Sequence, residues 1–269
     1  MSFQIRPIPS EDKPRDPRLD KMKHKDILPR LPANIMCLGR AGAGKSSCVY
    51  SLLNDGYTVK GKSVFDEIIV YLGTLDSVHS FKSLPCKNVV ILHEFIPEEF
   101  EQYLEDLKEH QMERLEKGKA PLNTCIVFDD FVGMGLLKHT GGRASPLERL
   151  CLTSRHECNA TIIFCSQAYK NNGLSNPTIR NNITHYIIYS MGRSEMEKIA
   201  QDHCGHMTEK EFLEMYDDIN RTPHNFLMIN YKKPDHERFT EGFLKPVGRK
   251  MLAHAKDAAP AESTDEAAK

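Results

Sequence analysis

The sequence predicts an α/β fold with a largely parallel central sheet that is covered by helices on both faces. Short, continuous apolar runs, such as residues 67–72 and 88–92, are typical of strands buried on both faces. An amphipathic stretch of helical period follows over residues 97–117, as expected for a crossover helix. A glycine-rich turn directly after the first apolar run has the form of a strand-to-helix connection.

The 269 residues suffice for one α/β domain with a substantial core, and we expect this domain over residues 31–245. Residues 1–30 are rich in proline and mixed charge and lack apolar periodicity, which predicts a flexible N-terminal arm. Residues 246–269 are rich in alanine and charged residues, which predicts a disordered C-terminal tail.

The composition indicates the cellular compartment of the protein but does not indicate its binding partners. The formal net charge is −1, so any contact with nucleic acid must come from local basic segments. Eight cysteines form no C-x-x-C pair, and several lie in apolar runs, which indicates free thiols in a reducing compartment. We find neither a signal-like N-terminus nor a run of about 18 apolar residues, and we expect a soluble, intracellular protein without a membrane-spanning segment.

The glycine-rich turn is the most informative motif in the sequence. It follows the apolar residues 34–38, and residues 39–46 match G-x-x-x-x-G-K-[ST], the phosphate-binding loop or Walker A motif. Backbone N–H groups must approach phosphate oxygens closely, so glycine is favoured in such a loop. A helical segment, residues 47–53, follows as the motif requires. The sequence therefore predicts a nucleotide site and a P-loop NTPase fold.

The residues of the loop have distinct expected roles. Lys45 would reach the β- and γ-phosphates, and the hydroxyl of Ser46 would coordinate Mg²⁺. The start of the helix adds partial positive charge. Ser47 offers a further hydroxyl, but a residue that only continues the helix is the better interpretation. The residues expected to bind the nucleotide are Gly39, Gly42, Ala43, Gly44, Lys45, Ser46 and Ser47.

Two consecutive carboxylates, Asp129 and Asp130, end the apolar run of residues 124–128. Open α/β sheets bind their ligands at the carboxyl ends of strands. We therefore expect Asp129 to be the outer-sphere partner of Mg²⁺ in the Walker B role and Asp130 to act as the general base that orients water. Aspartate is also common in turns after strands, but the phosphate-binding loop in the same chain favours the catalytic interpretation.

The segment after these carboxylates, residues 131–145, is rich in glycine and carries Lys138, His139 and Arg143. Basic side chains on flexible backbone can track nucleic-acid phosphates. A solvated connector explains the composition equally well.

A further buried strand is expected over residues 160–166, and Gln167 follows it. A glutamine in this place could hydrogen-bond the γ-phosphate or the attacking water as a sensor; the alternative is a polar residue that only ends the strand. The remaining predicted strands are residues 185–189 and 226–231, and the remaining predicted helices are residues 146–155, 194–203 and 208–216.

Two other groups of reactive side chains do not support a site. His203, Cys204 and His206 lack a second ligand pair at the spacing of a zinc finger. Cys158 lies near His156, but neighbours at this spacing do not face each other, and a buried thiol is the better interpretation.

Taken in order, these motifs resemble the FtsK/HerA superfamily of P-loop ATPases. The resemblance spans residues 31–231 and is closest to the genome-packaging ATPases of large DNA viruses of the poxvirus and phycodnavirus type. It rests on the phosphate-binding loop, the two aspartates, residues 154–156 (Ser-Arg-His), residues 161–167 (Thr-Ile-Ile-Phe-Cys-Ser-Gln) and residues 176–182 (Asn-Pro-Thr-Ile-Arg-Asn-Asn). It implies a RecA-like fold of the ASCE type.

The resemblance also implies a homo-oligomeric ring with ATP and Mg²⁺ between subunits, which pushes double-stranded DNA into a preformed capsid. Lys45, Asp130 and Gln167 would be catalytic, with an arginine finger from the next subunit just upstream of the sensor strand. Arg155 is our choice and Arg149 the alternative, because a bidentate cation suits the developing phosphoryl charge. Expected partners are capsid or portal-vertex proteins, at assembly sites in the host cytoplasm or in the virion.

One departure and two alternatives stay open. The superfamily usually has glutamate after the Walker B aspartate, whereas Asp130 is one methylene shorter. A P-loop kinase that phosphorylates a small molecule would need an acceptor pocket and an arginine-bearing lid, which we do not find in the motifs. A nucleotide-dependent switch that binds a protein partner would leave Asp130 and Gln167 with little to do.

Overall fold

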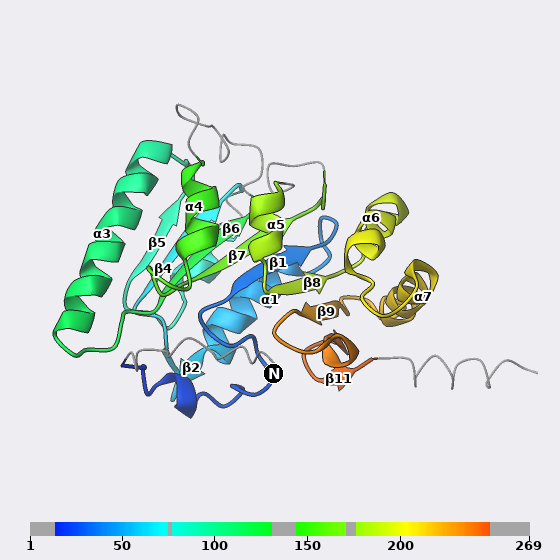
Figure 1. Ribbon diagram of the computed structural model, residues 1–269, viewed down its shortest axis with the longest axis horizontal. Helices are drawn as coiled ribbons and strands as arrows, with labels where there is room; N and C mark the ends of the chain where they lie inside the picture. The colour runs from blue at the N-terminus through cyan, green and yellow to red at the C-terminus, as the bar shows by residue number, and fades with distance from the viewer. Residues whose placement is uncertain (1–13, 75–76, 131–143, 171–175, 248–269) are drawn as a thin grey trace, which may run out of the picture.

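The computed structural model describes residues 14–74, 77–130, 144–170 and 176–247. Its centre is one nine-stranded sheet in the order β11-β10-β9-β8-β1-β7-β6-β4-β5 (Figure 1). The strands are β1 (Asn34–Leu38), β4 (Glu67–Leu72), β5 (Val89–Leu92), β6 (Thr124–Asp129), β7 (Ala160–Ser166), β8 (His185–Ile188), β9 (Leu227–Asn230), β10 (Phe239–Glu241) and β11 (Lys245–Pro246). The six strands from β8 to β5 are mutually parallel, and the pairs from β8 to β11 are antiparallel. The predicted α/β fold with a largely parallel sheet is confirmed.

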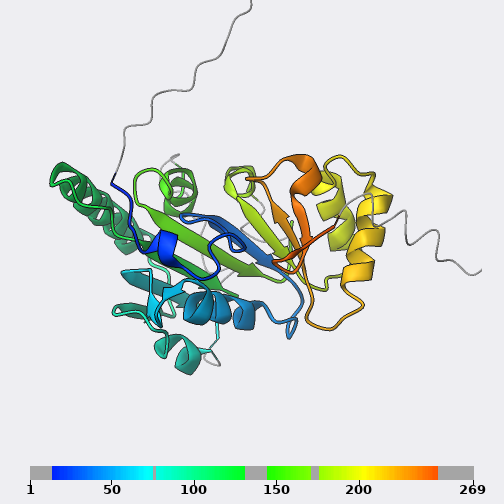
Figure 2. The ribbon, with the colours of Figure 1, turned by 90° about the horizontal axis from the view of Figure 1, so that it is seen from below.

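Helices cover the two faces of this sheet. They are α1 (Lys45–Ser51), which continues as a π-helical turn (Leu52–Gly56), α2 (Val78–Lys82), α3 (Pro97–Glu116), α4 (Pro146–Thr153), α5 (Pro177–Asn182), α6 (Arg193–His203) and α7 (Glu209–Ile219). Short 3-10 turns occur at Leu19–Lys21 and Asp235–Glu237, and a small hairpin joins β2 (Thr58–Val59) to β3 (Lys62–Ser63). Figure 2 shows α1 on one side of the sheet and α4 and α5 on the other.

The strands alternate their side chains between two cores, as a sheet covered on both faces requires. In β6, Ile126 and Phe128 contact the core beneath α3 to α7, whereas Cys125 and Val127 contact the core beneath α1 and α2. Every residue of β1, β6, β7 and β8 is buried. This burial explains why these strands appear in the sequence as continuous apolar runs.

The structure adds elements that the sequence analysis did not predict. Helix α5 begins where the side chain of Asn176 accepts a hydrogen bond from the N–H of Thr178, with Pro177 at the first helical position. Both are ordinary helix-start signals. Strands β10 and β11 extend the sheet beyond β9 through antiparallel pairing, which short and only partly apolar segments do not reveal.

Residues 14–30, which the sequence analysis assigned to the arm, pack against the domain. Leu19 and Met22 are buried in the core on the α1 side of the sheet. The guanidinium of Arg18 donates to both carboxylate oxygens of Asp66 at 2.8 Å. The hydroxyl of Tyr57 donates to the carbonyl of Pro29 at 3.0 Å. The rest of the predicted arm, residues 1–13, and nearly all of the predicted tail lie outside the described residues.

The helices of the described segments include none that combines the length and the apolar character needed to cross a membrane.

Candidate nucleotide-binding site

The phosphate-binding loop connects the end of β1 to the start of α1. Gly44 has φ of 107° and Gly42 has φ of 73°, and both values lie in the left-handed region that favours glycine. β1 lies between β7 and β8 in the sheet, so the loop is at the edge where the carboxyl ends of the parallel strands meet. This is the edge where open α/β sheets bind ligands.

Gly39 is required for a different reason, namely close packing. A Cβ atom at this position would lie 2.8 Å from the Cβ of Tyr189 and 3.1 Å from the Cβ of Ala43. Tyr189 directly follows β8, the neighbour of β1, and it is buried. The first glycine of the motif therefore lets the loop pass against the adjacent strand.

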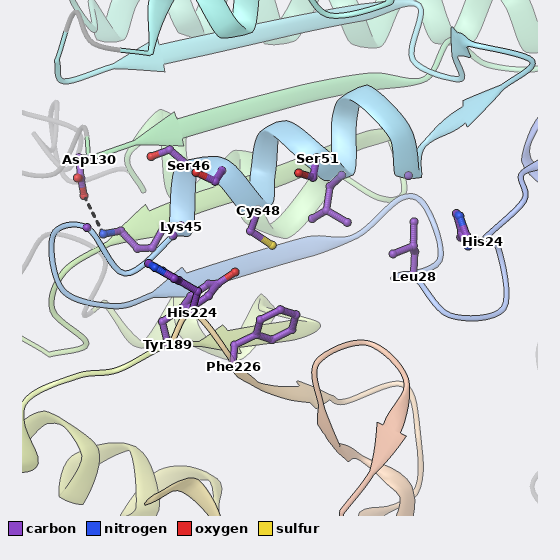
Figure 3. Close-up of a pocket in the computed structure, with 15 residues that line it drawn as sticks. His24, Leu28, Lys45, Ser46, Cys48, Ser51, Asp130, Tyr189, His224 and Phe226 are labelled. Carbon is purple, nitrogen blue, oxygen red and sulfur yellow. Dashed lines mark ion pairs between the residues drawn. The ribbon is translucent and has the colours of Figure 1, made fainter. Parts of the chain in front are cut away.

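The side chain of Lys45 is buried within the loop. Its Nζ donates to the carbonyl oxygens of Gly39 at 3.0 Å and Arg40 at 3.2 Å. The same Nζ lies 3.9 Å from Oδ1 of Asp130, as the dashed line in Figure 3 shows. The ammonium group thus lies between the loop and the carboxylate of Asp130, which follows β6.

Ser46 and Asp129 form the candidate magnesium site. The hydroxyl of Ser46 donates to Oδ1 of Asp129 at 3.0 Å. Asp129 is buried, and this burial raises the pKa of its carboxyl group, while hydrogen bonds from Ser46 and Cys165 act in the opposite direction. A hydroxyl and a carboxylate beside a phosphate-binding loop fit Mg²⁺, which prefers oxygen ligands and keeps several waters. The two residues therefore suit the group that the motif implies.

Asp130 and Gln167 meet next to this pair. Asp130 has φ of 48°, a left-handed conformation that turns the chain out of β6. The side-chain amide of Gln167 donates to Oδ2 of Asp130 at 3.1 Å. The structure thus brings together five side chains that the sequence analysis selected: Lys45, Ser46, Asp129, Asp130 and Gln167. Their catalytic roles stay predictions.

Arg155 lies at the opposite edge of the sheet. It follows Ser154, whose carbonyl accepts a hydrogen bond from the N–H of Ala160 at the start of β7. Because Gln167 follows the other end of this seven-residue strand, about 20 Å of β7 separate the two positions. Within one subunit Arg155 does not belong to the phosphate site. The alternative, Arg149, is paired with Glu101 and Glu105 on α3.

Other residues selected from the sequence have different outcomes. Lys138, His139 and Arg143 lie outside the described residues. The ring of His203 lies between the hydroxyls of Tyr169 and Tyr231 and hydrogen-bonds to both. The thiol of Cys158 is buried, which raises its pKa and disfavours the reactive thiolate.

A cavity of about 660 Å³ opens beside the loop. Besides loop and α1 residues, five side chains that the sequence analysis did not select line it: His24, Leu28, Tyr189, His224 and Phe226. They come from the N-terminal segment, the end of β8 and the approach to β9 (Figure 3). No local motif marks them, because only the tertiary fold brings these three segments to the phosphate-binding loop.

The fold and the geometry of this site define a P-loop NTPase. Residues 21–230 match the family described as Poxvirus A32 protein, and the chain therefore belongs to this family. It is an ATPase, and its family membership agrees with the resemblance to the genome-packaging ATPases of large DNA viruses in the FtsK/HerA superfamily.

Two solved structures have similar folds. The genome packaging NTPase B204 from Sulfolobus turreted icosahedral virus 2, in complex with ATP-gammaS, has a TM-score of 0.50 and 14% identity, over 80% of this chain and 98% of that chain. EssC (ATPases 2 and 3) from Geobacillus thermodenitrificans has a TM-score of 0.52 and 16% identity, over 84% of this chain and 43% of that chain. At such identities the likeness concerns the fold alone. Among curated protein sequences, none matches this chain significantly.

Proposed function

We propose that this protein is an ATP-driven motor that translocates double-stranded DNA and packages a viral genome into a preformed capsid. It acts as a homo-oligomeric ring with ATP at the subunit interfaces, at assembly sites in the host cytoplasm. The convergence of Lys45, Ser46, Asp129, Asp130 and Gln167 at one edge of the sheet carries this proposal. Membership of the poxvirus A32 family and the ATP-gammaS complex of B204 support it.

The loop and its lysine bind the triphosphate. Backbone N–H groups of residues 39–46 approach the phosphate oxygens, and the Nζ of Lys45 exchanges carbonyl partners for phosphate. The hydroxyl of Ser46 would coordinate Mg²⁺, and the adjacent carboxylate of Asp129 would hold its bound waters. When bound, Mg²⁺ neutralises the charge that develops on the β- and γ-phosphate oxygens.

Asp130 and Gln167 act on the water that attacks the γ-phosphate. The carboxylate of Asp130 orients this water and accepts its proton. The side-chain amide of Gln167 donates to Oδ2 of Asp130 and so fixes this carboxylate. This contact positions Asp130 although its side chain is one methylene shorter than the glutamate that is usual in the superfamily. Because Gln167 follows β7, loss of the γ-phosphate can be transmitted along that strand toward Arg155.

Hydrolysis by the purified protein tests the motor. We expect ATPase activity to rise with protein concentration and with double-stranded DNA, since the active site is completed by assembly. Lys45→Ala should abolish turnover. Asp130→Asn should retain ATP binding but slow hydrolysis by about 10²–10⁴-fold, the usual contribution of a general base. Activity indifferent to DNA and to concentration, or transfer of phosphate to an added small-molecule acceptor, would contradict the motor.

Mixed assemblies of two variants test whether Arg155 is the arginine finger. Arg155→Ala should leave ATP binding by a single subunit intact and should lower turnover by about 10³-fold or more. When inactive Arg155→Ala and Lys45→Ala subunits are mixed, part of the activity should return. The reason is that an intact Arg155 of one subunit then faces an intact loop of the next. Arg149→Ala serves as the matched control and should behave like the unaltered protein. Failure of the mixture to regain activity would exclude Arg155 as the finger.

A further inference from the structure

The cavity beside the phosphate-binding loop continues well past the phosphate-binding residues. Gly42, Gly44 and Lys45 line one end, and Ser51 and Gly56 line the other. Between Gly44 and Ser51 the helix α1 advances about 10 Å along its axis. The loop itself accounts for the phosphates of a nucleotide. The remaining volume is a space along the side of α1 that carries Cys48 and Ser51.

Aromatic side chains form the wall that faces α1. The ring centroids of Tyr189 and Phe226 are 5.2 Å apart, and those of Phe226 and Phe243 are 5.0 Å apart. Phe226 therefore packs against two aromatic neighbours while it remains partly accessible to the cavity. In Figure 3 it lies across the cavity from Cys48. A fixed aromatic ring in a partly apolar cavity suits a planar heterocycle.

His224 lies where the phosphate end and the aromatic end of the cavity meet. Its Nδ1 is 3.3 Å from the carbonyl oxygen of Ala43 and 3.6 Å from the place of a Cβ on Gly44. The residue is exposed and takes a left-handed φ of 60°. A polar ring in this place can contact the sugar that joins phosphates to a base.

The N-terminal segment lines the far end of the cavity. A Cβ on Gly56 would lie 2.8 Å from Cδ1 of Leu28, so this glycine allows the segment to pack directly on the end of the π-helical turn. His24 lines the cavity next to Leu28. Together with the hydroxyls of Ser47 and Ser51, it supplies a small number of polar groups in a largely apolar surface.

We propose that this cavity is the subsite for the ribose and base of a nucleoside triphosphate, with the base between the Cys48 side of α1 and Phe226. The inference rests on the proposed nucleotide-binding function and adds the residues that recognise the rest of the nucleotide. It makes residues 24–28 and the approach to β9 part of the binding site. A bound nucleotide therefore connects the N-terminal segment to the antiparallel end of the sheet.

Ser51→Phe tests the subsite because it fills the cavity from an exposed position on α1, away from both cores. Binding of ATP and of inorganic tripolyphosphate is measured by calorimetry for each variant. Ser51→Phe should lower the affinity for ATP by tenfold or more, because the loss of base stacking alone lowers affinity by about this factor. Tripolyphosphate, which has no base, should bind as before. Ser80→Phe adds the same side chain at an exposed position on α2 outside the cavity; it is the matched control and should bind ATP as tightly as the unaltered protein.

Phe226→Ala provides an independent variant on the opposite wall. It should lower the affinity for ATP by about tenfold without lowering the affinity for tripolyphosphate. Thermal unfolding verifies that the variant is folded. If folded Ser51→Phe and Phe226→Ala bind ATP as tightly as the unaltered protein, or lose tripolyphosphate equally, the base subsite is overturned. Lys45→Ala should lose both ligands. If the unaltered protein binds neither ligand, the proposed nucleotide function itself fails.

Discussion

The hydroxyl of Ser46 lies 3.0 Å from Oδ1 of Asp129, although the two residues are 83 positions apart in the chain. Ser46 is in the first turn of α1 and Asp129 ends β6, and β7 lies between β1 and β6 in the sheet. Helix α1 packs on β7, which carries Ser46 across the intervening strand. The strand order therefore determines which carboxylate meets the phosphate-binding loop.

This contact predicts that Ser46→Ala selectively weakens the binding of Mg²⁺. We expect the Mg²⁺ concentration for half-maximal ATPase activity to rise by about tenfold or more, because a direct protein ligand of the metal is lost. Ser47→Ala removes a neighbouring hydroxyl that does not contact Asp129 and should retain the original Mg²⁺ dependence. The same Mg²⁺ requirement in both variants would contradict the assignment of Ser46.

Gly39→Ala should displace the loop, because the added Cβ would lie 2.8 Å from the Cβ of Tyr189. Forced overpacking costs about 1–3 kcal/mol, so nucleotide affinity should fall by tenfold or more. Gly61→Ala is a suitable control, since Gly61 has φ of 73° with no atom within 4 Å of an added Cβ, away from the site. It should lower the midpoint of thermal unfolding while nucleotide affinity, measured by calorimetry, stays unchanged.

The sequence predicted the parallel part of the sheet because its strands are buried on both faces. Each strand from β8 to β4 is a continuous apolar run, and this pattern needs no tertiary information to be recognised. Strands β10 and β11 are short and partly exposed, so their pairing depends on β9 as a template. A local pattern could not predict them.

The catalytic side of the site was predictable for the same reason. Lys45 and Ser46 belong to a contiguous motif, and Asp130 and Gln167 directly follow buried strands. Ligand-facing residues at strand ends can be inferred once the strands are known. His224 and Leu28 follow no such rule, because they reach the cavity from segments 181 and 28 residues away from Ala43 and Gly56 respectively.

The packing of residues 14–30 predicts that the N-terminal segment contributes to stability. A protein that begins at residue 31 would lose the buried side chains of Leu19 and Met22, which should cost roughly 3 kcal/mol or more of unfolding free energy. A protein that begins at residue 14 should be as stable as the whole chain in urea unfolding. Equal midpoints for all three proteins would mean that residues 14–30 form a free arm.

Point variants test the same segment more finely. Arg18 bridges Asp16 and Asp66, so Arg18→Ala should lower the unfolding free energy by about 1 kcal/mol, a value that allows for its partial exposure. Arg15→Ala removes an exposed ion pair with Asp20 and should change the unfolding free energy by much less. The difference between the two urea midpoints measures the contribution of the Arg18 contacts.

His203 makes stability depend on pH. Burial lowers the pKa of its imidazole to about 4, with Arg180, Lys170 and Arg238 acting in the same direction and Asp202 opposing them. Because the pKa in the unfolded chain is about 6.5, the unfolded state binds a proton between pH 6.5 and 4 that the folded state does not. The sign is therefore that stability falls as the pH falls through this window, by up to about 3 kcal/mol from this residue.

His203→Gln isolates this effect from the carboxylates, whose contributions are shared by both proteins. The variant should be less stable at pH 7, because the hydroxyls of Tyr169 and Tyr231 lose their common partner. Between pH 6.5 and 4, however, its unfolding free energy should fall less steeply than that of the unaltered protein. His185, whose pKa burial also lowers to about 4, remains in both and cancels in the comparison. Urea unfolding at several pH values measures the two slopes, and equal slopes would show that His203 is not the residue that binds the proton on unfolding.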